Sequence, residues 1–231
     1  MTTRETLRVY GDDALGYLQG QLSQDVQAMA DGETKWSLVL QPTGKLVAWF
    51  RVQRRSSTDF LLDIDPGFAP MLTARLQRFL LRTKATIEPT ADVIDEPVRW
   101  PGLDDPDDEA QRIRAGMPRM GAELTEETIP GEGGQRFIDL SVSFTKGCYT
   151  GQELVARIDS RGGNVPRPIR VLEATAPATL TIGAAVLFDG EEVGSVTSVA
   201  GNVALAPLAR KVTLGSSVVV DGVPATVIEP A

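Results

Sequence analysis

The only thiol in this chain of 231 residues belongs to Cys148, within the segment Lys146–Glu153, which reads KGCYTGQE. A thiolate is both a nucleophile and a soft metal ligand, so Cys148 is the first candidate for side-chain chemistry. The chain contains no histidine, which excludes a Ser-His-Asp triad, a Cys-His dyad and a histidine-bound metal. Any acid–base work would therefore fall to carboxylates, lysine, tyrosine or the cysteine itself.

The residues after Cys148 have the pattern of a helix, which we expect to begin at Tyr149 or Thr150 and to reach Asp159. Cys148 would then lie at the helix N-terminus, where unpaired N–H groups and the helix dipole favour a thiolate. Lys146 adds a positive charge, and the same geometry favours binding of an anion such as a carboxylate. The alternative is that Cys148 is a small buried residue, as most lone cysteines are.

Composition narrows the class of protein. A net charge of −8 argues against general nucleic-acid binding, which needs clustered Lys and Arg, so a nucleic-acid partner is not expected. No apolar run is long enough to span a bilayer, and the N-terminal residues lack the apolar core of a signal peptide. One cysteine excludes an intrachain disulfide. We therefore expect a cytoplasmic protein without a membrane partner.

The first 88 residues are predicted to form an α+β domain, with helices packed on a largely antiparallel sheet. Asp12 or Asp13 is the expected N-cap of the first helix, and Asp65 that of the second. A hairpin turn is expected at 41–45, where Pro42 and Gly44 lie. The expected strands are 6–10, 36–40, 46–52, 60–64 and 84–87, and the expected helices are 14–22 and 66–82.

Residues 89–167 are predicted to form a middle region that starts with an acidic, proline-interrupted linker. The acidic cluster at 104–109 does not have the spacing of an EF-hand loop, so we interpret it as a solvated loop and expect no metal site. A short helix is expected at 111–118, followed by a loop as far as Glu132. The signature segment with its helix then completes this region, and Gly/Pro-rich residues up to 167 form a second linker.

Residues 168–231 consist of short β segments separated by glycines, which is typical of a small antiparallel barrel. Asp189-Gly190 and Asp221-Gly222 are strong hairpin signals. The expected strands are 169–172, 185–188, 193–199, 203–205, 217–220 and 225–228.

The segment KGCYTGQE, followed by Val155-Ala156-Arg157, resembles the signature of the YgfZ-type folate-binding proteins. That family is related to the aminomethyltransferase (T-protein) of the glycine cleavage system. Other segments resemble family motifs in the same order along the chain, namely 17–26, 40–45, 112–118 and 129–132. The resemblance covers most of the chain and implies a T-protein-like fold with a C-terminal barrel.

The resemblance implies an accessory protein that binds tetrahydrofolate or a derivative and supports assembly or repair of iron–sulfur enzymes. Its partners would be a folate-like molecule and iron–sulfur client proteins or assembly factors. Arg112 matches an arginine of the T-protein, which makes it the leading folate-binding residue, since arginine binds carboxylates bidentately. The signature would supply Cys148 as the functional thiol with Lys146 as its neighbouring cation, and the cofactor-binding residues Tyr149, Gly151, Gln152 and Glu153.

Two departures from the T-protein affect this implied function. Residues Gly44–Trp49 stand where the T-protein has Gly-Gly-Ile-Ile-Asp-Asp, so the carboxylate expected to activate folate is missing. The middle region is also shorter than is usual in the family. Conventional enzyme turnover is therefore not expected. Two alternatives stay open: a folate-dependent aminomethyl or one-carbon transferase, and a ligand-free protein-interaction scaffold.

Overall fold

The computed structural model describes residues 4–105, 107–160, 162–175 and 178–231. Contacts between residues divide the chain into two compact units. The first unit contains residues 1–96, 125–130 and 135–163, and the second contains residues 97–124, 131–134 and 164–231. Each unit is thus assembled from segments that lie far apart in the sequence.

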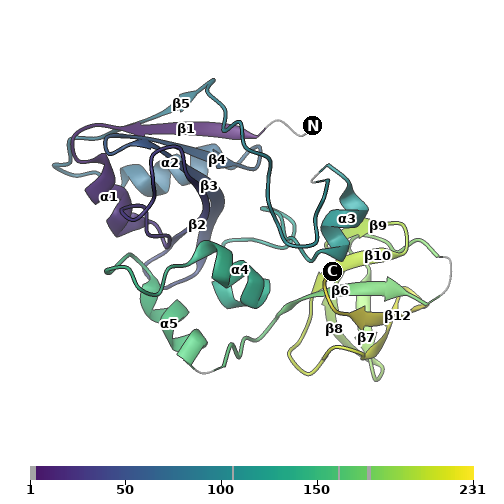
Figure 1. Ribbon diagram of the computed structural model, residues 1–231. Helices are drawn as coiled ribbons and strands as arrows, with labels where there is room; N and C mark the ends of the chain where they lie inside the picture. Colours follow the sequence, from purple (N-terminus) through teal and green to yellow (C-terminus); the bar gives the residue numbers. More distant parts are fainter. Residues whose placement is uncertain (1–3, 106, 161, 176–177) are drawn as a thin grey trace. The chain divides into compact units, whose positions relative to one another are not determined.

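The first unit is built on a five-stranded antiparallel sheet with the order β2-β3-β4-β1-β5 (Figure 1). Four of the five expected strands are confirmed, and the fifth, expected at 84–87, begins two residues later and extends to Thr90. The last strand contains Pro89, which we had placed beyond its end. Proline is tolerated there because β5 is an edge strand, where a missing N–H breaks no ladder bond on the open side. The strands are β1 (Glu5–Tyr10), β2 (Thr34–Leu40), β3 (Leu46–Ser56), β4 (Asp59–Ile64) and β5 (Thr86–Thr90).

Two helices, α1 (Ala14–Gln21) and α2 (Ala69–Gln77), pack on one face of this sheet and close its main core. The expectation of a helix over 66–82 is wrong at both ends. Gly67 has a φ of 88° and Arg82 a φ of 60°, neither of which continues a right-handed helix. The core side chains include Leu7, Val9, Leu18, Phe50, Val52, Phe60, Leu62, Leu72 and Leu76.

The predicted helix caps are also wrong, because tertiary contacts replace them. Asp13 occupies the N-cap position of α1 without capping it, and its carboxylate accepts the N–H of Lys84 at 2.8 Å. For α2, the first N–H, from Ala69, is accepted at 3.0 Å by Glu5, a residue of β1. Both helix starts are therefore fixed by residues distant in the sequence.

The opposite face of the sheet carries aromatic side chains that pack against a helix missed by the sequence analysis, α4 (Gly134–Ser141). The rings of Trp36 and Trp49 stack with centroids 3.9 Å apart, and Phe137 of α4 lies 5.1 Å from Trp49. The indole N–H of Trp49 donates to Ser141 Oγ at 2.9 Å. Side chains alternate along a strand, so Trp49 and its neighbour Phe50 fill the two different faces.

The second unit contains a seven-stranded antiparallel sheet with the order β8-β7-β11-β12-β6-β10-β9 (Figure 1). A bridge between Gly194 and Leu208 returns β8 toward the end of β10, as in a barrel that curls on itself. A short helix, α3 (Glu109–Arg114), packs its Ile113 on β6 and β10. The strands are β6 (Ile169–Ala174), β7 (Ala185–Phe188), β8 (Glu191–Ser195), β9 (Ser198–Ala200), β10 (Val203–Pro207), β11 (Ser217–Val220) and β12 (Val223–Ile228).

Both hairpin predictions in the barrel are confirmed. Asp189 and Asp221 have φ values of 54° and 50°, and the glycine after each is also left-handed, as a type I′ turn requires. The expected single strand at 193–199 is instead two strands, because β8 pairs with β7 while β9 pairs with β10. The fold is α+β and ends in an antiparallel barrel, as predicted.

Candidate functional site

The signature segment lies in the first unit and precedes helix α5, which runs from Gln152 to Ser160. The helix was expected to begin at Tyr149 or Thr150, and this is wrong because Gly151 has a left-handed φ of 83°. Cys148 lies four residues before the first helical residue, so it does not cap α5. The expectation that Cys148 lies at the N-terminus of this helix is therefore wrong.

Lys146 fixes the start of the segment to the last turn of α1 and to the chain that follows it. Its ammonium donates to the carbonyls of Gln19 and Leu22 at 2.7 Å and to that of Gln24 at 3.0 Å. Burial lowers the pKa of Lys146 to about 8, and Asp25 partly offsets this shift. Three carbonyl acceptors also favour the charged form. Lys146 is thus an anchor between distant segments as well as a neighbour of the cysteine.

Tyr149 and Gln152 bond to each other across the turn into α5. The amide oxygen of Gln152 accepts the N–H of Tyr149 at 3.2 Å, and the N–H of Gln152 donates to the Tyr149 carbonyl at 3.4 Å. The Tyr149 ring is buried, with Lys146 Nζ 5.2 Å from its centroid, and burial raises its pKa to about 12. The Gln152 side chain and the backbone of both residues therefore hold the turn closed.

Two glycines allow the 41–45 turn to pack directly on the signature. A Cβ built on Gly151 would lie 2.5 Å from the carbonyl oxygen of Gln41 and 2.8 Å from Cβ of Leu40. A Cβ on Gly44 would lie 2.4 Å from Cβ of Leu154 in α5. Real Cβ atoms do not approach other atoms so closely, so a larger residue at either position would force the two segments apart.

Cys148 points outward from this packed arrangement. It is exposed and forms no disulfide, which settles the alternative that it is a buried core residue. Glu153 is also exposed, on the first turn of α5. The signature therefore combines an anchoring part, formed by buried Tyr149 and half-buried Lys146 and Gly151, with a thiol that solvent and partners can reach.

Arg112, the predicted folate residue, belongs to the second unit and is only 1% exposed. Its Nε and Nη2 donate to the two carboxylate oxygens of Glu109 at 3.0 and 2.7 Å, and Nη1 donates to the Met117 carbonyl. Glu123 lies 3.5 Å from Nη1. The guanidinium is thus already engaged by groups of its own unit.

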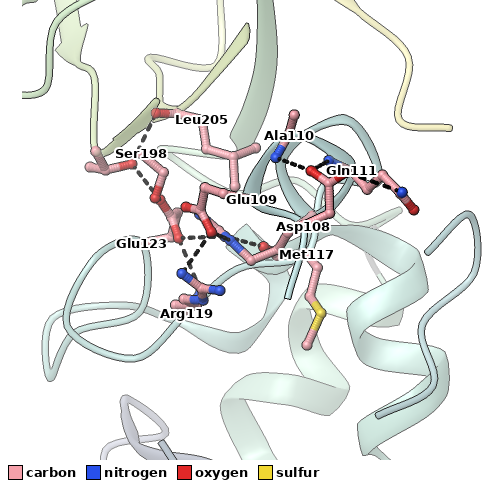
Figure 2. Close-up of polar contacts among 11 residues, drawn as sticks. Asp108, Glu109, Ala110, Gln111, Met117, Arg119, Glu123, Ser198 and Leu205 are labelled. Carbon is pink, nitrogen blue, oxygen red and sulfur yellow. Dashed lines mark hydrogen bonds and ion pairs between the residues drawn. The ribbon is translucent and has the colours of Figure 1, made fainter. Parts of the chain in front are cut away.

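The carboxylates around Arg112 connect α3 to the barrel, as Figure 2 shows for Glu109, Arg119, Glu123 and Ser198. Glu123 is buried and accepts from Ser198 Oγ at 2.5 Å and from the N–H of Arg119 at 3.0 Å. Burial alone would raise the pKa of Glu109, but Arg112 and Arg119 hold it below its usual range. The network joins α3, the 117–124 loop and β9.

Among the described residues there is no group of three or more Cys, Asp or Glu side chains placed to hold a metal ion. In the same part of the chain, no helix is both long and apolar enough to cross a membrane.

Comparison with known proteins gives a match for the C-terminal domain and a match for the fold of the chain. Residues 167–231 match the model described as the CAF17 C-terminal β-barrel domain. The glycine cleavage system aminomethyltransferase T of Bartonella henselae has the same fold, with a TM-score of 0.79 over 99% of this chain and 83% of its own. The two sequences are 14% identical, so this likeness shows the fold alone.

Three relatives extend the comparison to sequence. An uncharacterized protein of Haemophilus influenzae is 30% identical over 232 residues, which covers 86% of this chain and 82% of the relative. The human mitochondrial iron–sulfur cluster assembly factor is 43% identical over 83 residues, covering 35% of this chain. The tRNA-modifying protein YgfZ of Serratia proteamaculans is 38% identical over 95 residues, covering 38% of this chain. The chain belongs to the YgfZ-type folate-binding protein family.

The matched regions span 23% of the human protein and 26% of the Serratia protein. What those two proteins assemble or modify is therefore a property of much longer proteins than the shared region.

Three of the motifs that resemble the YgfZ-type family meet in the first unit. Lys146 binds carbonyls of the 17–26 segment, the N–H of Thr150 donates to the Gly20 carbonyl at 3.2 Å, and Gly151 packs on the 40–45 turn. Segments separated by about a hundred residues thus share one packed site. The 112–118 motif lies in the second unit instead.

An exposed apolar surface after α2 was not predicted from the sequence. The helix expected over 66–82 would include Phe79 and Leu81, whereas both lie beyond the end of α2, and Phe79 is 38% and Leu81 85% exposed. Four basic residues between positions 75 and 84 were the available signal, because a core-facing segment rarely carries so many cations.

Proposed function

We propose that this chain is a cytoplasmic accessory protein that supports the assembly or repair of iron–sulfur proteins through the Cys148 thiol. The observation that carries the proposal is the exposure of Cys148 on a segment that Lys146 and the buried Tyr149 anchor to the first unit. A thiol held on a fixed turn can meet a partner repeatedly in one geometry, which a thiol on a free loop cannot. The name of the human relative, an iron–sulfur cluster assembly factor, supports an iron–sulfur role.

The chain is proposed to act on clusters held by its partners. An iron–sulfur cluster normally takes four protein ligands, and this sequence supplies one cysteine and no histidine. Cys148 would therefore contribute at most one thiolate, and client proteins or assembly factors would supply the others. This arrangement suits transient contact with a partner and does not suit permanent cluster storage.

Tetrahydrofolate or a derivative is the proposed small-molecule ligand, on the basis of family and fold. The side chains predicted from the sequence to bind folate are not suited to it in their present contacts. Arg112 is buried with Glu109 and Glu123, the Gln152 amide oxygen accepts from Tyr149, and exposed Glu153 would repel a glutamyl carboxylate. The proposal of folate binding therefore does not rest on these side chains, and no chemical step is assigned to folate.

The alternative function, an aminomethyl or one-carbon transferase, is less well supported, because the first unit lacks the matching carboxylates. The positions that match the two aspartates of the T-protein are Ala48 and Trp49, which are buried on the two faces of β3. Trp49 stacks on Trp36 and bonds to Ser141. Neither residue offers the carboxylate that the transferase reaction would require, so we propose an accessory role without turnover.

Replacing Cys148 with alanine tests the proposed role of the thiol. In cells that depend on this chain, we expect the Cys148→Ala variant to lower the activity of host iron–sulfur enzymes, per amount of enzyme protein, to the level of the deletion. Thr145→Ala is the matched control, because Thr145 is an exposed neighbour on the same segment. Full client activity with Cys148→Ala would refute the proposal.

Calorimetric titration with tetrahydrofolate separates the ligand-binding functions from the scaffold alternative. We expect saturable heat and a thermal shift, with free glutamate as the control for a purely ionic effect. No heat and no shift at millimolar tetrahydrofolate would leave only the scaffold. Product formation from a methylamine-type donor would instead favour the transferase.

A further inference from the structure

The chain that follows α2 forms an exposed surface, which we call the 78–84 tip. Leu81 is 85% exposed, more than any other large apolar residue described, and Phe79 is 38% exposed. Arg78, Arg82 and Lys84 are exposed around them. An exposed leucine beside an exposed aromatic ring costs hydration free energy unless something covers it.

The tip is held in one conformation by its own backbone. The N–H groups of Phe79, Leu80 and Thr83 donate to carbonyls three residues earlier, at 3.0, 3.1 and 3.3 Å. At its end, the N–H of Lys84 donates to the Asp13 carboxylate. Arg82 has a left-handed φ of 60°, which costs about 1–2 kcal/mol for a residue other than glycine. The exposed Leu81 is therefore part of a fixed turn.

The tip is basic on an acidic protein. Within the described residues, Arg78, Arg82 and Lys84 form no ion pair with a carboxylate, while the whole chain has a net charge of −8. The carboxylate of Asp13, at the end of the tip, accepts the backbone N–H of Lys84. Cations around an apolar centre complement a partner surface that has acidic residues around an apolar side chain.

A short series of contacts links the tip to the signature within the first unit. The Phe79 ring lies 4.2 Å from the guanidinium carbon of Arg75, and Arg75 donates through Nε and Nη2 to the Leu40 carbonyl at 3.0 and 2.8 Å. Leu40 in turn packs on Gly151, three residues after Cys148. The tip and the thiol are thus both fixed to the 40–45 turn.

We propose that the 78–84 tip is the docking surface for the iron–sulfur protein that Cys148 serves, and that it binds an acidic surface with an apolar centre on that protein. The inference rests on the proposed function and adds the site at which the partner is recognised. Leu81 and Phe79 supply the apolar contact, and the three cations select an acidic partner. Docking here would place the partner on the same compact unit as the thiol.

Two variants of the tip test the proposal in cells. We expect Leu81→Asp and the double variant Arg78→Glu/Arg82→Glu to lower client iron–sulfur enzyme activity to the level of Cys148→Ala. Loss of a central contact weakens such complexes about 30-fold or more. Leu214→Asp is the matched control, since Leu214 is 51% exposed in the second unit. The affected side chains are exposed, so denaturant unfolding curves of the purified variants should match that of the wild type.

Photo-crosslinking identifies the occupant directly. With p-benzoylphenylalanine at position 81, we expect crosslinks in cells to iron–sulfur proteins, identified by mass spectrometry, and their loss when Arg78→Glu/Arg82→Glu is added. Crosslinks only to a second copy of this chain, or Leu81-dependent binding to anionic phospholipid vesicles without protein crosslinks, would overturn the proposal.

The activity data distinguish a failure of docking from a failure of the proposed function. If the tip variants retain full client activity while Cys148→Ala does not, the docking surface is refuted and the role of the thiol stands. If Cys148→Ala also retains full activity, both proposals fall.

Discussion

Replacing Arg112 with alanine is expected to lower the free energy of unfolding of the second unit by about 3–5 kcal/mol, the usual cost of breaking a buried ion pair from one side. Arg112 is 1% exposed and Glu123 is 3% exposed, so neither group can exchange its partner for water. Removal of the guanidinium leaves Glu123 as a buried carboxylate without its cation. Denaturant unfolding followed by the fluorescence of Trp100 would measure the loss.

Arg114→Ala is the matched control for Arg112, because it removes an arginine from the same helix. Arg114 pairs with Glu173, but its side chain is 42% exposed, and exposed pairs contribute about 0–1 kcal/mol. A second variant, Arg112→Met/Glu123→Gln, should recover about 1–3 kcal/mol relative to Arg112→Met alone, because the buried negative charge is removed together with the guanidinium.

A small loss of stability in Arg112→Ala would contradict a structural role for Arg112. If Arg112→Ala cost less than about 1 kcal/mol, the value typical of an exposed pair, the guanidinium would not be a structural centre. It would then be available to a folate carboxylate, as the sequence resemblance implies. Loss of tetrahydrofolate binding in a fully stable Arg112→Ala protein would establish that role.

Replacing Gly151 with alanine is expected to destabilise the first unit by about 2–5 kcal/mol. The left-handed backbone at Gly151 costs a residue with a Cβ about 1–2 kcal/mol, and forcing atoms into a packed contact costs about 1–3 kcal/mol. The contact is with backbone, because the new Cβ would lie 2.5 Å from the Gln41 carbonyl oxygen. Backbone moves less easily than the end of a side chain.

Gly147→Ala is the matched control for Gly151 within the same segment. Its backbone is not left-handed, and a Cβ there would meet no atom within 4 Å. We expect an unfolding free energy within about 0.5 kcal/mol of the wild type, as for surface substitutions generally. Hydrogen exchange should also show faster exchange over 40–45 and 146–153 in Gly151→Ala only. Equal stability of the two variants would contradict the packing described for the signature.

Local pattern in the sequence was sufficient for most of the regular structure. Alternating apolar residues predicted the strands of the first sheet, and Asp-Gly pairs predicted both type I′ hairpins, because these depend on residues next to one another. Helix ends were predicted less well. The start of α2 at Ala69 depends on a carboxylate of β1, and the start of α5 depends on the left-handed backbone of Gly151. Helix α4 was missed entirely.

For the candidate site too, some properties followed from the sequence and others only from the tertiary structure. The sequence by itself determined that Cys148 is the only thiol, that no histidine can assist it, and that its segment carries a family signature. Only the tertiary structure decided that the thiol is exposed, that Lys146 anchors three carbonyls, and that Arg112 is enclosed by carboxylates. The physical reason is that these properties depend on residues from about ten to more than a hundred positions away. Burial and hydrogen-bond partners are set when such segments pack together, and no local period in the sequence records which of them will meet.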